Sequence, residues 1–149
     1  MRTPAINGEK FIMVILDQQS RYVEVHCIRE KSEALSRYQI YCNKAHTLHD
    51  RKIKFLRADG GGEFNSLAFL NFLDGQGTTF ERTMPYSSRE NPMIERMNRT
   101  LMNMARCFLH YANMPTQFWR EAVLLAAYTH NRTPTKALDK KTLNQTCQI

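Results

Sequence analysis

The sequence predicts an α/β domain with a mixed sheet, and three observations support this. The run FIMVIL (Phe11–Leu16) is short, apolar and rich in β-branched residues, which is typical of a buried strand. Apolar residues recur at helical spacing over residues 31–49, which indicates an amphipathic helix. A second strand-like run, KIKFLR (residues 52–57), follows that helix and completes a strand–helix–strand unit.

Local signals predict the other elements. Asn7-Gly8 is a turn signal before the first strand, and Ser32 is expected to cap the first helix. A short helix is expected to begin at Asn65 or Ser66 and to stop after Leu73, because glycines follow. The remaining strands are expected at residues 21–28 and 78–83, and the remaining helices at about 92–112 and 116–130.

Length and charge limit the function classes. The 149 residues fit one domain, and the formal net charge of +7 suits a polyanionic partner such as nucleic acid. A solvated basic surface explains the charge equally well. Since the sequence has no apolar run long enough for a bilayer and no secretory signal, we expect a cytoplasmic or nuclear protein without a membrane partner.

The cysteines and histidines do not suggest a zinc site. The four cysteines are widely scattered with no CxxC pair, so reduced thiols are expected. His46 and His49 lie three residues apart on the first predicted helix, but no cysteine pair accompanies them. We therefore interpret both as surface histidines.

Two acidic residues stand out by position. Asp59 lies just after a predicted strand, where open α/β sheets bind their ligands. Glu95 lies in the first turn of the long helix. Each also has a purely structural explanation, since aspartate is common in turns and a carboxylate is favoured near a helix N-terminus.

The long helix has one apolar and one polar side. Its apolar residues share about a third of the circumference, whereas Glu95, Arg99, Arg106 and His110 cluster on the opposite side. This arrangement favours contact with DNA phosphates through the arginines. The alternative is an i,i+4 ion pair between Glu95 and Arg99, which contributes only a few tenths of a kcal/mol.

Longer motifs carry a family resemblance. LRADGGGEF (residues 56–64) and NPMIERMNRTLMNMAR (residues 91–106), at this separation, resemble the integrase catalytic core of copia-type retrotransposons. DQQSRY, KSEAL, PYS, FWREAV and NRTPTKAL match as well, so the resemblance extends over residues 1–138. Residues 139–149 form a divergent tail.

The resemblance implies an RNase H-like fold, with a mixed sheet flanked by helices, and a two-metal site for Mg²⁺ or Mn²⁺. Asp59 and Glu95 match its second and third catalytic acids and metal ligands. The first acid is expected in a His-x-Asp segment upstream of Met1, together with the central strand. The sheet is therefore expected to be divided, with residues 1–6 as a possible partial replacement. Asp17 is not expected to substitute, because it matches a turn.

The resemblance also suggests nucleic-acid-binding residues and two functional readings. Arg96, Arg99, Arg106 and Asn91 are the expected nucleic-acid contacts, and Asn91 is expected to hold the active-site loop. Glycine usually stands where this chain has Pro92, which stiffens that loop. The first reading is a fragment of the polynucleotidyl transferase that joins element ends to target DNA, inactive alone. The second is a non-catalytic remnant that binds DNA or pairs with other integrase subunits.

Overall fold

The computed structural model describes residues 3–50, 52–58, 61–82 and 92–134. The chain divides into two compact units. Unit 1 comprises residues 1–29 and 93–149, and unit 2 is the continuous segment 30–92. In the part of the chain that the structure describes, no helix has the length and apolar character required to cross a membrane.

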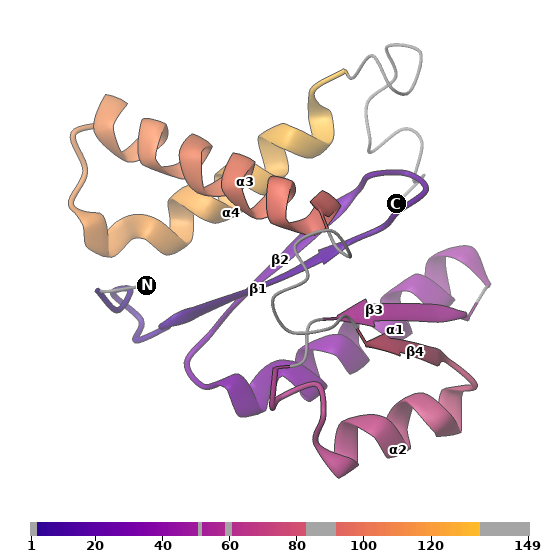
Figure 1. The fold of residues 1–149 in the computed structure, drawn as a ribbon. Helices are drawn as coiled ribbons and strands as arrows, with labels where there is room; N and C mark the ends of the chain where they lie inside the picture. The colour runs from indigo at the N-terminus through magenta and orange to yellow at the C-terminus, as the bar shows by residue number, and fades with distance from the viewer. Residues whose placement is uncertain (1–2, 51, 59–60, 83–91, 135–149) are drawn as a thin grey trace. The chain divides into compact units, whose positions relative to one another are not determined.

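Unit 1 contains an antiparallel hairpin of β1 (Phe11–Leu16) and β2 (Val23–Ile28), with Phe11 opposite Ile28 and Leu16 opposite Val23 (Figure 1). Both strands were predicted, and β2 begins two residues later than expected because the turn extends through Tyr22. Arg21 adopts a positive φ of 65° in this turn.

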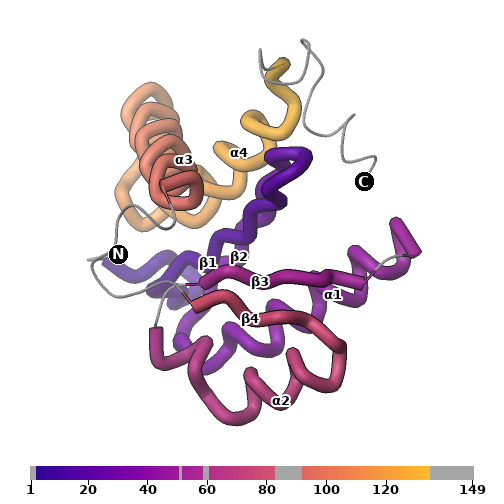
Figure 2. Tube along the Cα trace, turned by 45° about the vertical axis from the view of Figure 1, so that its right-hand side comes forward, coloured from indigo at the N-terminus to yellow at the C-terminus, as the bar shows by residue number. Residues whose placement is uncertain are grey.

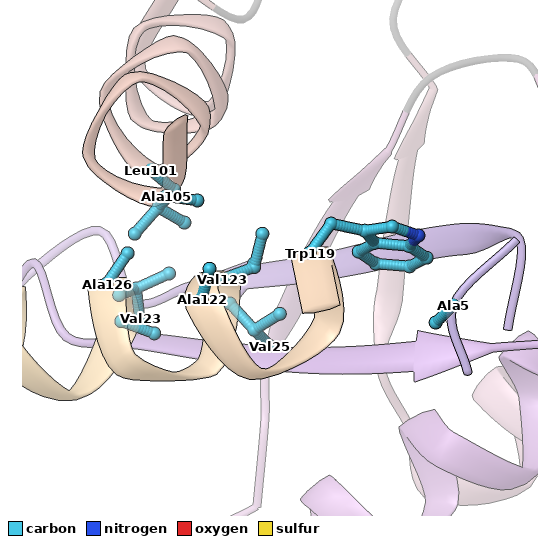
Figure 3. Packing of buried hydrophobic residues seen from close by; sticks show 10 residues of the cluster. Ala5, Val23, Val25, Leu101, Ala105, Trp119, Ala122, Val123 and Ala126 are labelled. Atoms are coloured by element: carbon cyan, nitrogen blue, oxygen red, sulfur yellow. The ribbon is translucent and has the colours of Figure 1, made fainter. Parts of the chain in front are cut away.

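Two helices pack with this hairpin. α3 (Pro92–Tyr111) is followed by a 3₁₀ turn (Thr116–Phe118) and α4 (Trp119–Arg132). Figure 3 shows Leu101 and Ala105 of α3 directed towards α4, while α4 lies along β2. The buried core residues of unit 1 are Ala5, Val23, Val25, Leu101, Ala105, Trp119, Ala122, Val123, Ala126 and Ala127.

Side-chain hydrogen bonds to the backbone attach α4 to two distant segments. The buried Asn131 accepts a hydrogen bond from the Val23 N–H at 3.0 Å and donates one to the Val23 carbonyl at 2.8 Å. The indole N–H of Trp119 donates to the Thr3 carbonyl at 2.9 Å. Residues 3–6 therefore lie at the start of α4 and form no strand, so the expectation of a replacement strand is wrong for them.

Unit 2 contains a 3₁₀ turn (Lys31–Glu33), α1 (Ala34–His49), β3 (Phe55–Ala58), α2 (Leu67–Gln76) and β4 (Thr79–Arg82). β3 and β4 are parallel, with Phe55 opposite Thr79 and Ala58 opposite Arg82. Figure 2 shows α1 and α2 on the same side of this strand pair. The two helices meet through aromatic rings, since the centroids of Tyr38 and Phe69 are 5.3 Å apart.

Three helix and strand ends differ from the sequence prediction. Ser32 is not the first cap, because a capping box between Glu30 and Glu33 takes that role and the Glu30 N–H donates to Glu33 at 3.0 Å. Ser66 caps α2 as expected, but the helix continues through Gly75 and ends at Gly77, whose φ is 69°. β3 begins at Phe55, three residues later than predicted, because Phe55 is paired with Thr79, the first residue of β4.

The described strands form two separate two-stranded sheets, one antiparallel and one parallel. Both strand orientations of a mixed sheet are therefore present, and the expected division of the sheet is seen in these strands. The α/β class follows from how each unit is built. In each, helices cover the apolar side of a strand pair that cannot bury itself.

Candidate nucleic-acid and metal-binding site

The candidate site is built on α3, which has two clearly different sides. Leu101 and Ala105 are 1% and 2% exposed, and the apolar residues around them, Met97, Met104 and Phe108, are partly buried against the core of unit 1. Glu95 lies in the first turn and is exposed. The predicted amphipathic helix is confirmed, and its apolar side is the one that packs.

The opposite side of α3 is polar and accessible to solvent. We call it the polar face, and its members, all exposed, are Glu95, Arg96, Arg99, Asn103, Arg106 and His110. Because α3 rises about 1.5 Å per residue, these side chains are distributed over roughly 22 Å of helix. The face carries three guanidinium groups and one carboxylate, so it has a positive charge with an acid at one end.

The polar face is not neutralised by ion pairs within α3. Among the described residues, Glu95 forms no ion pair, and the alternative Glu95–Arg99 pair is absent. Arg106 donates to the neutral side chain of Asn103 at 3.0 Å, which holds one guanidinium in place without cancelling its charge. Such a surface can neutralise phosphates at one point and hold a cation at another.

The other two predicted site residues cannot be placed. Asp59 and Asn91 both lie outside the described residues. β3 ends at Ala58 in the described residues, directly before Asp59 in the sequence. The convergence of Asp59 and Glu95, and the contact of Asn91 with a loop, stay predictions.

The described part of the glycine loop is held by contacts within unit 2. The Phe64 N–H and the Asn65 side-chain amide both donate to the Gly61 carbonyl, at 3.1 and 3.0 Å. Glu63 pairs with Lys31 at 3.3 Å, and only 17% of its side chain is exposed. Glu63 therefore has a structural role, because its ion pair with Lys31 attaches the loop to the 3₁₀ turn that precedes α1.

Asp17 lies in the turn between β1 and β2, as expected. Its carboxylate accepts hydrogen bonds from both the N–H and the hydroxyl of Ser20, the first at 2.7 Å. Arg21, beside it, reaches the sulfur of Met93 in the first turn of α3. These contacts give Asp17 a structural role as the residue that closes the hairpin turn.

Cysteines and histidines do not form a metal centre in the described chain, where no group of three or more potential ligands converges. Cys27, Cys42 and Cys107 are free thiols. Burial raises the pKa of Cys27 to about 11, so it stays protonated near neutral pH. A small hollow of about 50 Å³ near Cys42 and His46 has room for water, but its lining contains no carboxylate.

Two residues escaped the sequence analysis. Asn131 was recognised only as part of a motif, and its double hydrogen bond to Val23 could not be seen without the fold. Tyr111, the last residue of α3, is 95% exposed. It lies near the edge of the apolar stripe, at the end where α3 extends beyond the core.

Comparison with known proteins adds sequence relatives from plants. The chain is 33% identical over 138 residues to the retrovirus-related Pol polyprotein from transposon TNT 1-94 of Nicotiana tabacum. It is 25% identical over 134 residues to the corresponding polyprotein from transposon RE2 of Arabidopsis thaliana. These matches cover 93% and 90% of the chain, which spans only 10% and 9% of the two relatives. No family model matches.

Solved structures show the same fold. The simian T-cell lymphotropic virus intasome, determined with the PP2A regulatory subunit B56 gamma, contains a chain that matches with a TM-score of 0.75 and 20% identity, over 93% of this chain and 48% of its own. The HTLV-2 integrase catalytic core domain, determined with magnesium in a trimeric form, matches with a TM-score of 0.67 and 21% identity, over 90% and 82%.

Proposed function

Because the chain belongs to the integrase-core region of the retrotransposon Pol polyproteins, we propose that it is the part of a polynucleotidyl transferase that holds DNA along α3 and contributes two metal-binding carboxylates, Asp59 and Glu95. We assign residues 1–138 to this core and 139–149 to a divergent tail. The DNA would be the ends of the element and its target.

The polar face of α3 is the observation that carries this proposal. Arg96, Arg99 and Arg106 are exposed beside Glu95, while the reverse side of the helix is fixed in the core. Arginine forks match the geometry of phosphate oxygens, and neutralising them releases counterions from DNA. Contacts of this kind position a backbone but do not read its sequence, so loose target choice is expected.

The chemistry of the carboxylates suits a hard divalent cation. Oxygen ligands are the ones that Mg²⁺ and Mn²⁺ prefer, and the carboxylate of Glu95 is accessible and unpaired among the described residues. When bound, a metal pair would supply charge stabilisation at the phosphate under attack by water or a DNA 3′-hydroxyl. The glutamate would contribute ligand oxygens at the start of α3, close to the arginines that orient the strand.

DNA affinity tests the polar face directly. In fluorescence anisotropy with a labelled duplex, Arg99→Glu combined with Arg106→Glu should lower affinity at least tenfold and flatten its salt dependence. A matched control is Lys44→Glu combined with Arg132→Glu, which changes the net charge equally at exposed positions on other helices. Equal losses in both double variants would show that net charge alone binds DNA and would refute this face as the site.

A chemical footprint supplies a second readout. Cys107 is exposed on α3 next to Arg106, whereas Cys27 is partly buried and has a raised pKa. Bound DNA should slow the alkylation of Cys107, measured by peptide mass spectrometry, and leave the slow reaction of Cys27 unchanged. Unprotected Cys107 at saturating DNA would contradict the proposed orientation.

Metal binding separates the two functional readings. Glu95→Gln should weaken Mn²⁺ binding, measured by electron paramagnetic resonance, while metal-free DNA binding stays intact. Because the resemblance assigns the first acid to a segment upstream of Met1, we expect this chain alone to give no strand-transfer product. Product that disappears on Asp59→Asn would overturn that expectation. DNA binding without any metal dependence would support the non-catalytic, DNA-binding or integrase-pairing alternative.

A further inference from the structure

The C-terminal end of α3 presents an aromatic ring almost entirely to solvent. Tyr111 is 95% exposed, the most exposed of the large hydrophobic residues in the described chain. Its ring takes part in none of the aromatic contacts there. Scattered apolar residues are normal on protein surfaces, so the exposure alone has no functional meaning. The surroundings of Tyr111 give it one.

Backbone hydrogen bonds close the C-terminal end of α3 just after Tyr111. The N–H of Ala112 donates to the Phe108 carbonyl at 3.0 Å, that of Asn113 to His110 at 3.1 Å and that of Met114 to Leu109 at 2.9 Å. Asn113 has a φ of 49°, which is the left-handed residue of a Schellman-type helix end. Tyr111 is thus held on a fixed helix end, and docking a flat ligand on its ring immobilises only the side chain.

Tyr111 also lies beside the C-terminal end of the polar face, between that face and the apolar side of α3. Arg106 and His110 precede it within about one and a half turns, and both are exposed. From Glu95 to Tyr111 the helix rises about 24 Å, which corresponds to roughly seven nucleotides of a B-form strand. A nucleic acid that follows the arginines from Glu95 and extends past His110 round the end of the helix can therefore contact the tyrosine.

We infer that Tyr111 is a stacking platform for an unpaired nucleobase of the DNA held on the polar face of α3, an inference that rests on the proposed function. An aromatic ring gains contact only with an open base face, and inside a duplex both faces are covered by neighbouring pairs. The ligand is therefore a single-stranded flank or frayed end. Stacking on aromatic side chains adds affinity with little sequence preference, which agrees with phosphate-directed binding by the arginines.

The test uses 2-aminopurine, whose fluorescence is quenched by stacking, placed at successive positions in the single-stranded flank of a short duplex. The complete chain should quench the probe at one or two positions and bind the flanked duplex more tightly than a fully paired duplex of the same length. Tyr111→Phe should preserve both effects. Tyr111→Ser should remove the quenching and weaken binding of the flanked duplex roughly 5- to 100-fold.

A matched control is available, and failure of the inference gives a different result from failure of the proposed function. Tyr128→Ser removes another exposed tyrosine, which lies on α4 with the Arg132 guanidinium 3.6 Å from its ring centroid, and should leave quenching unchanged. If Tyr111→Ser quenches and binds like the wild type while the Arg99/Arg106 double reversal abolishes binding, the inference fails and the proposed function stands. If the wild type binds neither duplex, both fail.

Discussion

The two units of this chain stabilise themselves in different ways. Unit 1 brings together segments more than a hundred residues apart, and its core contains many small side chains such as Ala105, Ala122 and Ala126. Unit 2 is one continuous segment whose core is dominated by aromatic rings. There Phe69 contacts the rings of both Tyr38 and Phe64, with centroids 5.3 and 5.5 Å apart.

This difference bears on function. α3 packs into this core with one side only, which leaves its polar face accessible to solvent. The same core distributes its burial over many residues, and its alignment depends on directed hydrogen bonds such as those of Asn131. Unit 2 instead concentrates burial in a few rings, so a single substitution there should be more damaging.

The largest effect is expected at Phe69, which is fully buried in unit 2. Phe69→Ala should lower the free energy of unfolding by about 3–5 kcal/mol, because it removes two ring contacts and leaves a cavity. Urea unfolding measures the loss, and hydrogen exchange should show it first in β3 and β4. The control is Leu67→Ala on the same helix, where the side chain is 74% exposed. Similar losses for the two variants would contradict the aromatic core.

The next effect is expected in unit 1, at Asn131. Asn131→Ala should lower the free energy of unfolding by about 2–3 kcal/mol, because it leaves the Val23 N–H and carbonyl buried without partners. Arg132→Ala, at the adjacent exposed position, should change it by less than about 1 kcal/mol. A loss below that of Arg132→Ala would show that water satisfies Val23 instead.

A smaller, pH-dependent effect is expected from His130 in α4. Burial lowers the pKa of His130 below its usual value, so the unfolded chain binds a proton more readily than the folded one. Its contribution to stability is therefore complete above the usual pKa and is lost as the pH falls through the lowered one. Unfolding from about pH 7.5 to pH 5 should show a steeper decline for the wild type than for His130→Gln. Parallel curves would exclude this histidine as the source.

The smallest effect is expected on the surface of unit 2, where Arg57 of β3 pairs with Glu81 of β4 at 2.7 Å. Both side chains are more than 40% exposed, so solvent screens the pair. A double-mutant cycle with Arg57→Ala and Glu81→Ala should give a coupling of at most about 1 kcal/mol, reduced by added salt. A coupling of the size of the Asn131 effect would mean that polar surface contacts matter as much in unit 2 as buried ones in unit 1.

Sequence patterns predicted those features that depend on near neighbours. The strand Phe11–Leu16 and the helix that begins at Pro92 are correct, because each is set by apolar periodicity over a short stretch. The exposure of Glu95, Arg99 and Arg106 followed from the same periodicity. The capping box at Glu30 and the continuation of α2 through Gly75 were missed, since several local signals compete at helix ends.

By itself, the sequence determined the α/β class, the amphipathic long helix and the resemblance to the integrase core of retrotransposons, because periodicity and motif spacing can be read along the chain. Only the tertiary structure decided that Asn131 pairs with Val23, that Trp119 holds residue Thr3 and that Tyr111 extends beyond the core. These contacts join residues up to 116 positions apart in the sequence. Local sequence patterns carry no information about such contacts, since the contacts depend on how whole helices and strands pack.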